Sequence, residues 1–275
     1  MDHEECSLLL PGERIDDLLR NNLKIIQSRE VFSFSMDAVL LSHFCSVPAR
    51  GNVMDLCTGN GVIPILLTAR TKASIDGVEI QERLASMAAR SVKLNKLTEQ
   101  VTIKHMDLKE ANLHYGHGGF DLVTVNPPYL ATFTRDQNEN PHFAAARHEI
   151  YCTLEDVVVA CAKLVKFGGK VAMVHRAIRL TDILILLRKH RLEPKRLRFV
   201  HPRLGEEANM VLVEAVREGK PDLRLLPPLI VYKNKTEYCD ELMKVYNEPL
   251  GSLEEQEGTG KGQDLLERDC AKELS

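Results

Sequence analysis

The sequence predicts an α/β fold built on a seven-stranded, mostly parallel sheet with helices on both faces. The first observation is that short runs rich in β-branched residues alternate with longer amphipathic runs between residues 50 and 217. The second is that the short runs are apolar over most of their length, which is typical of parallel strands covered on both sides. The third is the composition of the 275 residues, of which 44% are hydrophobic and 27% charged, so that the chain can bury a full core.

The expected elements follow one another in strand–helix order. The seven strands are expected at 53–57, 74–79, 101–106, 120–125, 170–175, 196–200 and 209–216. Helices are expected at 62–71, 81–95, 154–167 and 181–190, with a further helix starting at Ala38. Sheets of this kind bind ligands beyond the carboxyl ends of their strands, so functional residues should directly follow the strands.

Charge divides the chain into a body and a tail. The net charge of −3 is uneven, because residues 250–275 carry seven acids and three bases and leave residues 1–249 with +1. We expect an N-terminal extension over 1–50, a core over 51–217, a C-terminal extension packed on it over 218–249, and a disordered acidic tail over 250–275.

One segment of the body is strongly basic. Residues 188–203 hold seven bases and one acid, with Phe199 and His201 between them. This composition is typical of a phosphate-binding surface for nucleic acid, and a merely solvated charged face is the alternative. The candidate RNA-binding residues in this segment are Arg188, Lys195, Arg196 and Arg198.

Several classes of protein are excluded. No run of about 18 apolar residues occurs, which rules out a membrane-spanning helix, and the acidic start lacks the basic region of a signal peptide. The seven cysteines are scattered without a C-x-x-C pair, so we expect buried or incidental thiols in a reducing cytoplasm, with no disulfide framework. No metal is expected, because His114 and His117 have no third ligand near them in the sequence.

A glycine loop follows the first strand of the core, in the segment Asp55-Leu56-Cys57-Thr58-Gly59-Asn60-Gly61. Two glycines permit a tight turn and a close approach of ligand to backbone. A dinucleotide fingerprint would place a third glycine where Pro64 stands, which argues against NAD or FAD. Glu79 ends the next strand, where a carboxylate can accept both ribose hydroxyls, although alone it could be a solvated strand end.

The fourth strand runs directly into Asn126-Pro127-Pro128-Tyr129. Proline ends the strand, and a residue before proline is held extended. The side-chain oxygen of Asn126 and the carbonyl of Pro127 can accept the two N–H bonds of a planar amino group, which directs its lone pair at a methyl donor without a strong base. Tyr129 offers a flat face for a base. The alternatives are a simple strand terminator and, among substrates, adenine, guanine N2 or a glutamine amide.

With these motifs, the chain resembles class I S-adenosylmethionine-dependent methyltransferases, which have a Rossmann-like fold. The resemblance implies that the glycine loop holds the methionine part of the cofactor, that Glu79 holds the ribose and that Asp107 accepts from the adenine amino group. Cys57 stands where glycine is frequent, a departure that we expect to be tolerated because cysteine is small. The cofactor residues expected on this basis are Asp37, Asp55, Cys57, Thr58, Gly59, Asn60, Gly61, Glu79, Ile80, Asp107, Leu108 and Asn126.

Residues 15–248 resemble a narrower group, the bacterial methyltransferases that modify adenine N6 beside the anticodon of tRNA1(Val). The resemblance rests on Gln27, on the segment 32–41, on the Asn126–Tyr129 loop and on Ala144-Ala145-Ala146-Arg147-His148-Glu149. It implies a lid over 34–41 that brings Asp37 to the cofactor, and an N-cap of the helix from Ala38 is the alternative role of Asp37. Arg147 is a candidate substrate contact, or else pairs with Glu149.

We therefore expect methyl transfer from S-adenosylmethionine to adenine N6 in RNA, with tRNA as the partner and no indication of the oligomeric state. A release-factor-type glutamine methyltransferase shares the Asn-Pro-Pro-Tyr loop, but usually has a longer domain before the core than the roughly 50 residues here. A guanine-N2 methyltransferase of ribosomal RNA often has Phe at the position of Tyr129 and a duplicated domain. A non-catalytic RNA-binding module is the third alternative, against which the intact loop argues.

Overall fold

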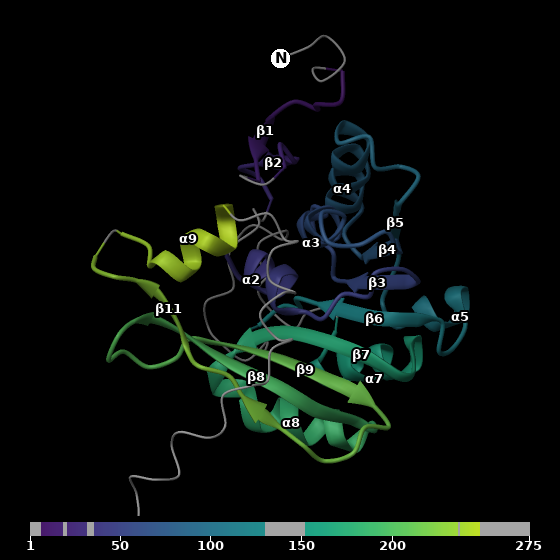
Figure 1. The fold of residues 1–275 in the computed structure, drawn as a ribbon. Coiled ribbons are helices and arrows are strands. Elements are labelled where there is room, and N and C mark those ends of the chain that lie inside the picture. The colour runs from purple at the N-terminus through teal and green to yellow at the C-terminus, as the bar shows by residue number, and fades with distance from the viewer. Residues whose placement is uncertain (1–6, 19–20, 32–35, 130–151, 236, 248–275) are drawn as a thin grey trace, which may run out of the picture.

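The computed structural model describes residues 7–18, 21–31, 36–129, 152–235 and 237–247, and its centre is one large sheet. The strands of this sheet are β3 (Asn52–Leu56), β4 (Ser74–Glu79), β5 (Val101–His105), β6 (Phe120–Val125), β7 (Val165–Arg176), β8 (Leu192–Arg203), β9 (Met210–Arg217), β10 (Arg224–Leu225) and β11 (Leu229–Tyr232). Their order is β10-β8-β9-β7-β6-β3-β4-β5, with β11 also paired with β8 (Figure 1). All contacts are parallel except those of β9, which runs antiparallel to β7 and β8. The predicted mostly parallel sheet is confirmed.

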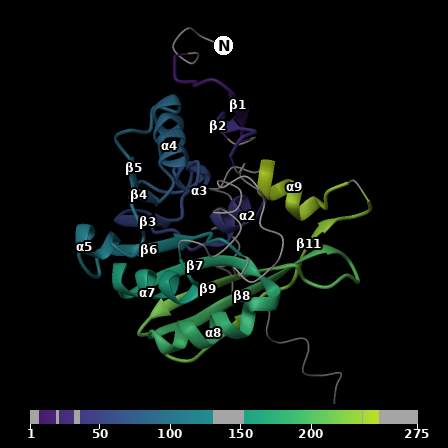
Figure 2. The ribbon, with the colours of Figure 1, turned by 180° about the vertical axis from the view of Figure 1, so that it is seen from behind.

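Helices cover both faces of the sheet, as predicted. One face carries α2 (Met36–Phe44), α3 (Val62–Leu67) and α4 (Glu82–Leu94), and the other carries α5 (Ala111–Tyr115), α7 (Leu154–Leu164) and α8 (Leu180–Lys189), as Figures 1 and 2 show together. A short 3-10 turn, η1 (Ala177–Arg179), joins β7 to α8, and α9 (Asp240–Asn247) lies beside β11 and α2. Strand residues alternate between the two cores: Val174 packs with the α2–α3 side and Met173 with the α7–α8 side.

The sheet has nine strands where seven were predicted. The two additional strands, β10 and β11, are two and four residues long, too short to show a periodic pattern in the sequence. Both pair with β8 and extend that side of the sheet. A third element missed by the sequence is a separate two-stranded antiparallel sheet of β1 (Glu13–Asp17) and β2 (Lys24–Ser28).

Element ends differ from the prediction at the junction of α7 and β7. The helix stops at Leu164, and Val165 is already extended with φ −71° and ψ 139°, so the helix predicted to 167 was too long. Residues 166–169 form a bulge, because the register with β6 moves from Phe120–Val165 to Leu122–Lys170. Gly168, at φ +71°, supports the turn of this bulge.

The predicted division of the chain into four parts stays a prediction. In the C-terminal extension, Leu242 of α9 and Leu229 of β11 are buried in the same core as α2 and α3. The acidic tail at 250–275 lies outside the described residues. Across the described segments, no helix combines the length and the apolar character needed to span a bilayer.

Candidate cofactor and catalytic site

The carboxyl ends of four neighbouring strands meet at one edge of the sheet. In the register, Leu56 of β3 pairs with Val78 of β4 and with Val125 of β6, and Val125 pairs with Met173 of β7. The glycine loop, Glu79, the Asn126–Tyr129 loop and the end of β7 therefore lie side by side. This edge is where a doubly covered parallel sheet binds its ligand.

The two glycines of the loop serve different purposes. Both have left-handed backbones, with φ +58° at Gly59 and +90° at Gly61. A Cβ at Gly61 would lie 3.0 Å from the Cβ of Ala88, so this glycine lets α4 pack closely on the loop. A Cβ at Gly59 would meet no atom within 4 Å, so Gly59 borders open space that a ligand can use.

Cys57 is the exception in this loop, because it is a non-glycine residue with φ +56°. Side-chain size was expected to decide whether cysteine is tolerated here, but the constraint is the left-handed backbone, at a strain of about 1–2 kcal/mol. Its thiol packs in the core on the α7 side with Cys152, just before α7. A hydrogen bond with Cys152, together with burial, raises the pKa of Cys57 well above its usual value.

Asp55 ties the loop to the neighbouring strand. It is fully buried, and its carboxylate accepts hydrogen bonds from Thr58 Oγ1 and from Thr124 Oγ1, each at 2.6 Å. Burial raises the pKa of Asp55 to about 7, although both hydroxyls oppose the shift. Asp55 and Thr58 were predicted to bind cofactor, and in this structure they bond to each other, so their observed contribution is to fix the shape of the loop.

Glu79 holds the loop from the other side. Its Oε2 accepts from the Gly59 amide and its Oε1 from the Gln81 amide, both at 2.9 Å. The side chain is buried, and burial raises its pKa above the usual value against these two bonds. A carboxylate that is buried but positioned by backbone amides beside Gly59 is well placed to receive hydroxyl donors of a ligand.

The other residues predicted after β4 and β5 differ in exposure. The Ile80 carbonyl accepts a hydrogen bond from His105 Nε2 at 2.9 Å. Asp107 is partly exposed and forms an ion pair with Lys109 at 3.3 Å. Leu108 is buried in the core on the α7 side, so its side chain packs within the protein.

A hydroxyl joins the Asn126–Tyr129 loop, the candidate catalytic loop, to α2. Tyr129 Oη lies within hydrogen-bond reach of Asn126 Oδ1 and of Asp37 Oδ2, and its one hydrogen is shared between these two acceptors. Asp37 lies in the first turn of a helix that begins at Met36, and its Oδ1 also accepts from the Ala38 amide at 2.9 Å. The alternative of an N-cap at Asp37 is therefore wrong. Burial, reinforced by the Asp37 charge, raises the pKa of Tyr129 well above its usual value.

His175 lies at the same edge of the sheet and was not among the site residues predicted from the sequence. It lies near the end of β7, is 1% exposed, and its ring centroid is 5.2 Å from that of Tyr129. The signal was present in the sequence, since His175 ends a predicted strand at the same edge as Glu79 and Asn126.

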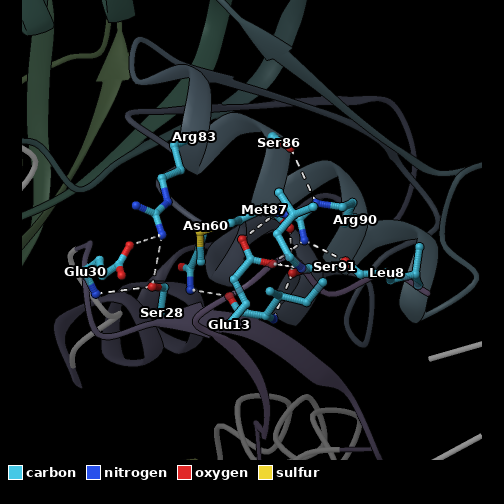
Figure 3. Close-up of polar contacts among 12 residues, drawn as sticks. Leu8, Glu13, Ser28, Glu30, Asn60, Arg83, Ser86, Met87, Arg90 and Ser91 are labelled. Carbon is cyan, nitrogen blue, oxygen red and sulfur yellow. Dashed lines mark hydrogen bonds and ion pairs between the residues drawn. The ribbon is translucent and has the colours of Figure 1, made fainter. Parts of the chain in front are cut away.

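The β1–β2 hairpin packs beside Asn60 of the glycine loop (Figure 3). Asn60 Nδ2 donates to the Ile26 carbonyl at 3.3 Å, and the Ile26 amide donates to Ser91 Oγ of α4 at 3.0 Å. Arg90 of α4 forms an ion pair with Glu13, whose side chain is 1% exposed. In Figure 3, Asn60 lies between the Arg83–Ser28 contact on one side and the Arg90–Glu13 ion pair on the other. The hairpin is thus built into the site through partners distant in sequence.

The basic segment 188–203 has partners within the protein. Arg196 pairs with the buried Glu214 at 3.3 Å and stacks on the Phe44 ring at 4.9 Å. Lys195 Nζ donates to the Lys220 carbonyl at 2.6 Å. The remaining five bases form ion pairs: Arg188–Glu193, Lys189–Glu155, Arg191–Glu218, Arg198–Glu241 and Arg203–Glu206.

The structure does not bring residues 188–203 next to the Asn126–Tyr129 loop. The strands β9 and β7 separate β8 from β6, and Arg188 is at the end of α8 that leads into the start of β8. Its RNA-binding role stays a prediction, and Arg147 lies outside the described residues. The described part of the chain contains no group of three His, Cys, Asp or Glu residues that could hold a metal ion.

Comparison with known proteins places this geometry in a family. The methyltransferase small domain family matches residues 22–185. The chain belongs to this methyltransferase family. The tRNA1(Val) (adenine(37)-N6)-methyltransferase of Aeromonas hydrophila is 30% identical over 184 residues, which cover 66% of this chain and 75% of that protein. The protein of the same name from Porphyromonas gingivalis W83 is 26% identical over 185 residues, covering 65% and 72%.

Solved structures share the fold. A predicted O-methyltransferase from Agrobacterium tumefaciens superposes with a TM-score of 0.62 at 22% identity, covering 77% of this chain and 96% of that one. TYW2 of Pyrococcus horikoshii gives a TM-score of 0.55 at 12% identity, covering 76% and 73%. These likenesses confirm the Rossmann-like class I methyltransferase fold predicted for this small-domain methyltransferase.

Proposed function

We propose that the protein transfers the methyl group of S-adenosylmethionine to N6 of an adenine in tRNA, beside the anticodon of tRNA1(Val), in the cytoplasm. The observation that carries the proposal is the hydrogen bond from Tyr129 Oη to Asn126 Oδ1. It shows that this oxygen is turned toward a donor at the sheet edge, as acceptance of an amino hydrogen requires. The names of the related proteins support adenine N6 and tRNA.

The residues at the edge fit the cofactor. Gly59 borders open space, and the buried Glu79 carboxylate lies next to it, held by the Gly59 and Gln81 amides. In our proposal, Glu79 receives the ribose hydroxyls and the loop over 57–61 receives the methionine part, while Ile80, Asp107 and Leu108 border the adenine. Asp37 closes the site from α2. Bound S-adenosylmethionine supplies an electrophilic methyl group on a sulfonium.

The catalytic loop positions the amine of the substrate. Asn126 Oδ1 and the Pro127 carbonyl accept its two N–H bonds and favour the pyramidal form, in which the nitrogen lone pair is available for attack. The new N–C bond forms as the C–S bond breaks, and the extra proton leaves to water, so no basic side chain is needed. Tyr129 releases Asn126 when the amine arrives, and its ring then stacks on the base.

Methylation of a tRNA transcript by the purified protein tests the proposal. The change Asn126→Ala should lower the rate of methyl transfer by at least about a hundredfold, as expected for loss of a positioned polar group, while S-adenosylmethionine binding persists. Asn112→Ala, on α5 away from this edge, is the matched control and should keep the wild-type rate. Mass spectrometry should find N6-methyladenosine as the product.

Two results would contradict the proposal. Undiminished transfer by Asn126→Ala would show that the loop does not position the amine. Methylation of a glutamine-containing peptide, with none of tRNA, would establish the release-factor type of activity in place of the proposed one.

A further inference from the structure

His175 lies behind the catalytic loop at the level of Pro127. The register pairs Met173 of β7 with Val125 of β6, so the side chain two residues later in β7 extends past the end of β6. The His175 ring packs against the Tyr129 ring, with 5.2 Å between centroids and an angle of 57° between planes. Tyr129 therefore forms a cover over His175 on the side of the catalytic loop.

The hydrogen bonds of His175 define which nitrogen carries its proton. Nδ1 accepts from the Arg176 amide at 2.9 Å, so in the neutral ring the hydrogen is on Nε2. The ring is neutral, because burial lowers the pKa of His175 to about 4. His175 is thus a hydrogen-bond donor through Nε2 over the whole physiological range.

This donor is buried and unused. Nε2 has no hydrogen-bond partner within the described part of the chain, although the atom is shielded from solvent. Most buried polar atoms in proteins are paired, so an unpaired donor at a ligand-binding edge is a sign of a ligand contact. Tyr129, which covers it, is the same residue whose hydroxyl occupies Asn126 Oδ1.

We propose that entry of a substrate amine at Asn126 displaces the Tyr129 hydroxyl and moves the ring that covers His175, and that His175 Nε2–H then donates a hydrogen bond to a ring nitrogen of the target adenine, N1 or N7. This inference rests on the proposed function. N1 and N7 are the acceptors that flank the N6 amino group, so a donor beside the amine site meets one of them.

A contact to N1 gives selectivity against guanine. Guanine carries a hydrogen on N1, so a donor aimed at this position is opposed by another donor. A site built around a specific hydrogen bond rejects an analogue that lacks it more strongly than an apolar site does.

The test combines variants of His175 with altered RNA. His175→Phe keeps a planar ring without the donor, and His175→Gln keeps an N–H donor. Each full-length protein is assayed for kcat/KM on tRNA anticodon-arm RNA that carries adenosine, 1-deazaadenosine or 7-deazaadenosine at the target position. Binding of S-adenosylmethionine is measured in parallel as a check on folding.

We expect His175→Phe to lower kcat/KM on adenosine RNA about tenfold to a hundredfold. His175→Gln should recover part of the loss. On the deaza analogue that lacks the contacted nitrogen, the wild-type kcat/KM should fall by a similar factor. On the same RNA, His175→Phe should have the same kcat/KM as the wild-type protein. The analogue with this pattern identifies the nitrogen.

An equal loss of kcat/KM on all three RNAs would overturn the inference and assign His175 a purely structural role. Failure of the proposed function looks different, since the wild-type protein would then methylate none of the three RNAs.

Discussion

Replacing Asp55 with asparagine should remove a pH dependence of stability that comes from one buried carboxyl group. Asp55 is fully buried between two threonine hydroxyls, and burial raises its pKa from 3.8 to about 7. The folded protein therefore holds a proton on Asp55 that the unfolded chain releases. The stability that this proton provides is fully present below about pH 4, and it is lost as the pH rises through the pKa of Asp55 in the folded protein.

The magnitude follows from the two pKa values. Between them the free energy of unfolding falls by about 1.36 kcal/mol per pH unit for one proton. From pH 5 to pH 8 the wild-type protein should therefore lose about 2–3 kcal/mol through Asp55 alone, because the slope flattens above pH 7. Asp55→Asn keeps the size and an acceptor oxygen but has no such proton.

Urea unfolding of the ligand-free protein, followed by circular dichroism at pH 5, 6, 7 and 8, measures this effect. The stability of Asp55→Asn relative to wild type should rise by about 2–3 kcal/mol across the range. The control is Asp121→Asn. Burial acts to raise the pKa of Asp121, but its contacts with Lys166 and Asn52 hold it below the usual value, so this carboxyl is ionised in both states above pH 5. A constant difference between Asp55→Asn and wild type at every pH would refute the reasoning.

Three further changes test other parts of the structure. Arg90→Ala should lower the free energy of unfolding in urea by about 2 kcal/mol, because the Glu13 carboxylate loses its ion pair and keeps the Leu10 amide as a donor. Arg83→Ala, whose acid partner is 64% exposed, should lower it by less than about 1 kcal/mol. Equal losses for the two variants would show that the Arg90–Glu13 pair does not fix the hairpin to α4. Tyr129→Ala should lower kcat/KM on tRNA about tenfold to a hundredfold, because stacking on the base is lost. Tyr129→Phe keeps the ring and should have nearly the wild-type kcat/KM. A large defect in Tyr129→Phe would assign the hydroxyl a role in the reaction. Cys57→Val should be less stable than Cys57→Gly by at least about 1 kcal/mol, since a β-branched residue is strained at φ +56°; similar melting temperatures for the two would contradict this.

The fold could be predicted because its signals are local. Each predicted core strand is an apolar run bounded by turn residues, and alternation with amphipathic runs fixes a parallel arrangement. The strands β10 and β11 were missed because two and four residues carry no distinct period. The strands β1 and β2 are as long as the predicted β3 and were missed because they form a separate hairpin outside the strand–helix alternation. The end of α7 was misplaced for a related reason, because Val165 and Phe167 continue an apolar pattern whether the backbone is helical or extended.

The residues of the candidate site could be predicted where their position after a strand decides their place. They could not be predicted where contacts between distant residues decide it. Residues after strand ends, such as Glu79 and Asn126, were found because parallel strands bring their ends together. The charge on Arg196 was visible in the sequence, but its buried partner Glu214 is 18 residues away and belongs to another strand. The left-handed backbone of Cys57 and the unpaired nitrogen of His175 depend on the folded conformation, so they cannot be predicted from the residue type.

The contacts of the β1–β2 hairpin with α4 have a consequence for the order of folding. A two-stranded hairpin of five-residue strands is marginally stable by itself. Its partners on α4 lie 65 to 77 residues further along the chain, so during synthesis the hairpin emerges well before the helix that holds it. The hairpin therefore remains without its support until α4 has been made. The hairpin side of the candidate cofactor site is completed only after β4 and α4 have formed, and until then the hairpin is open to proteases.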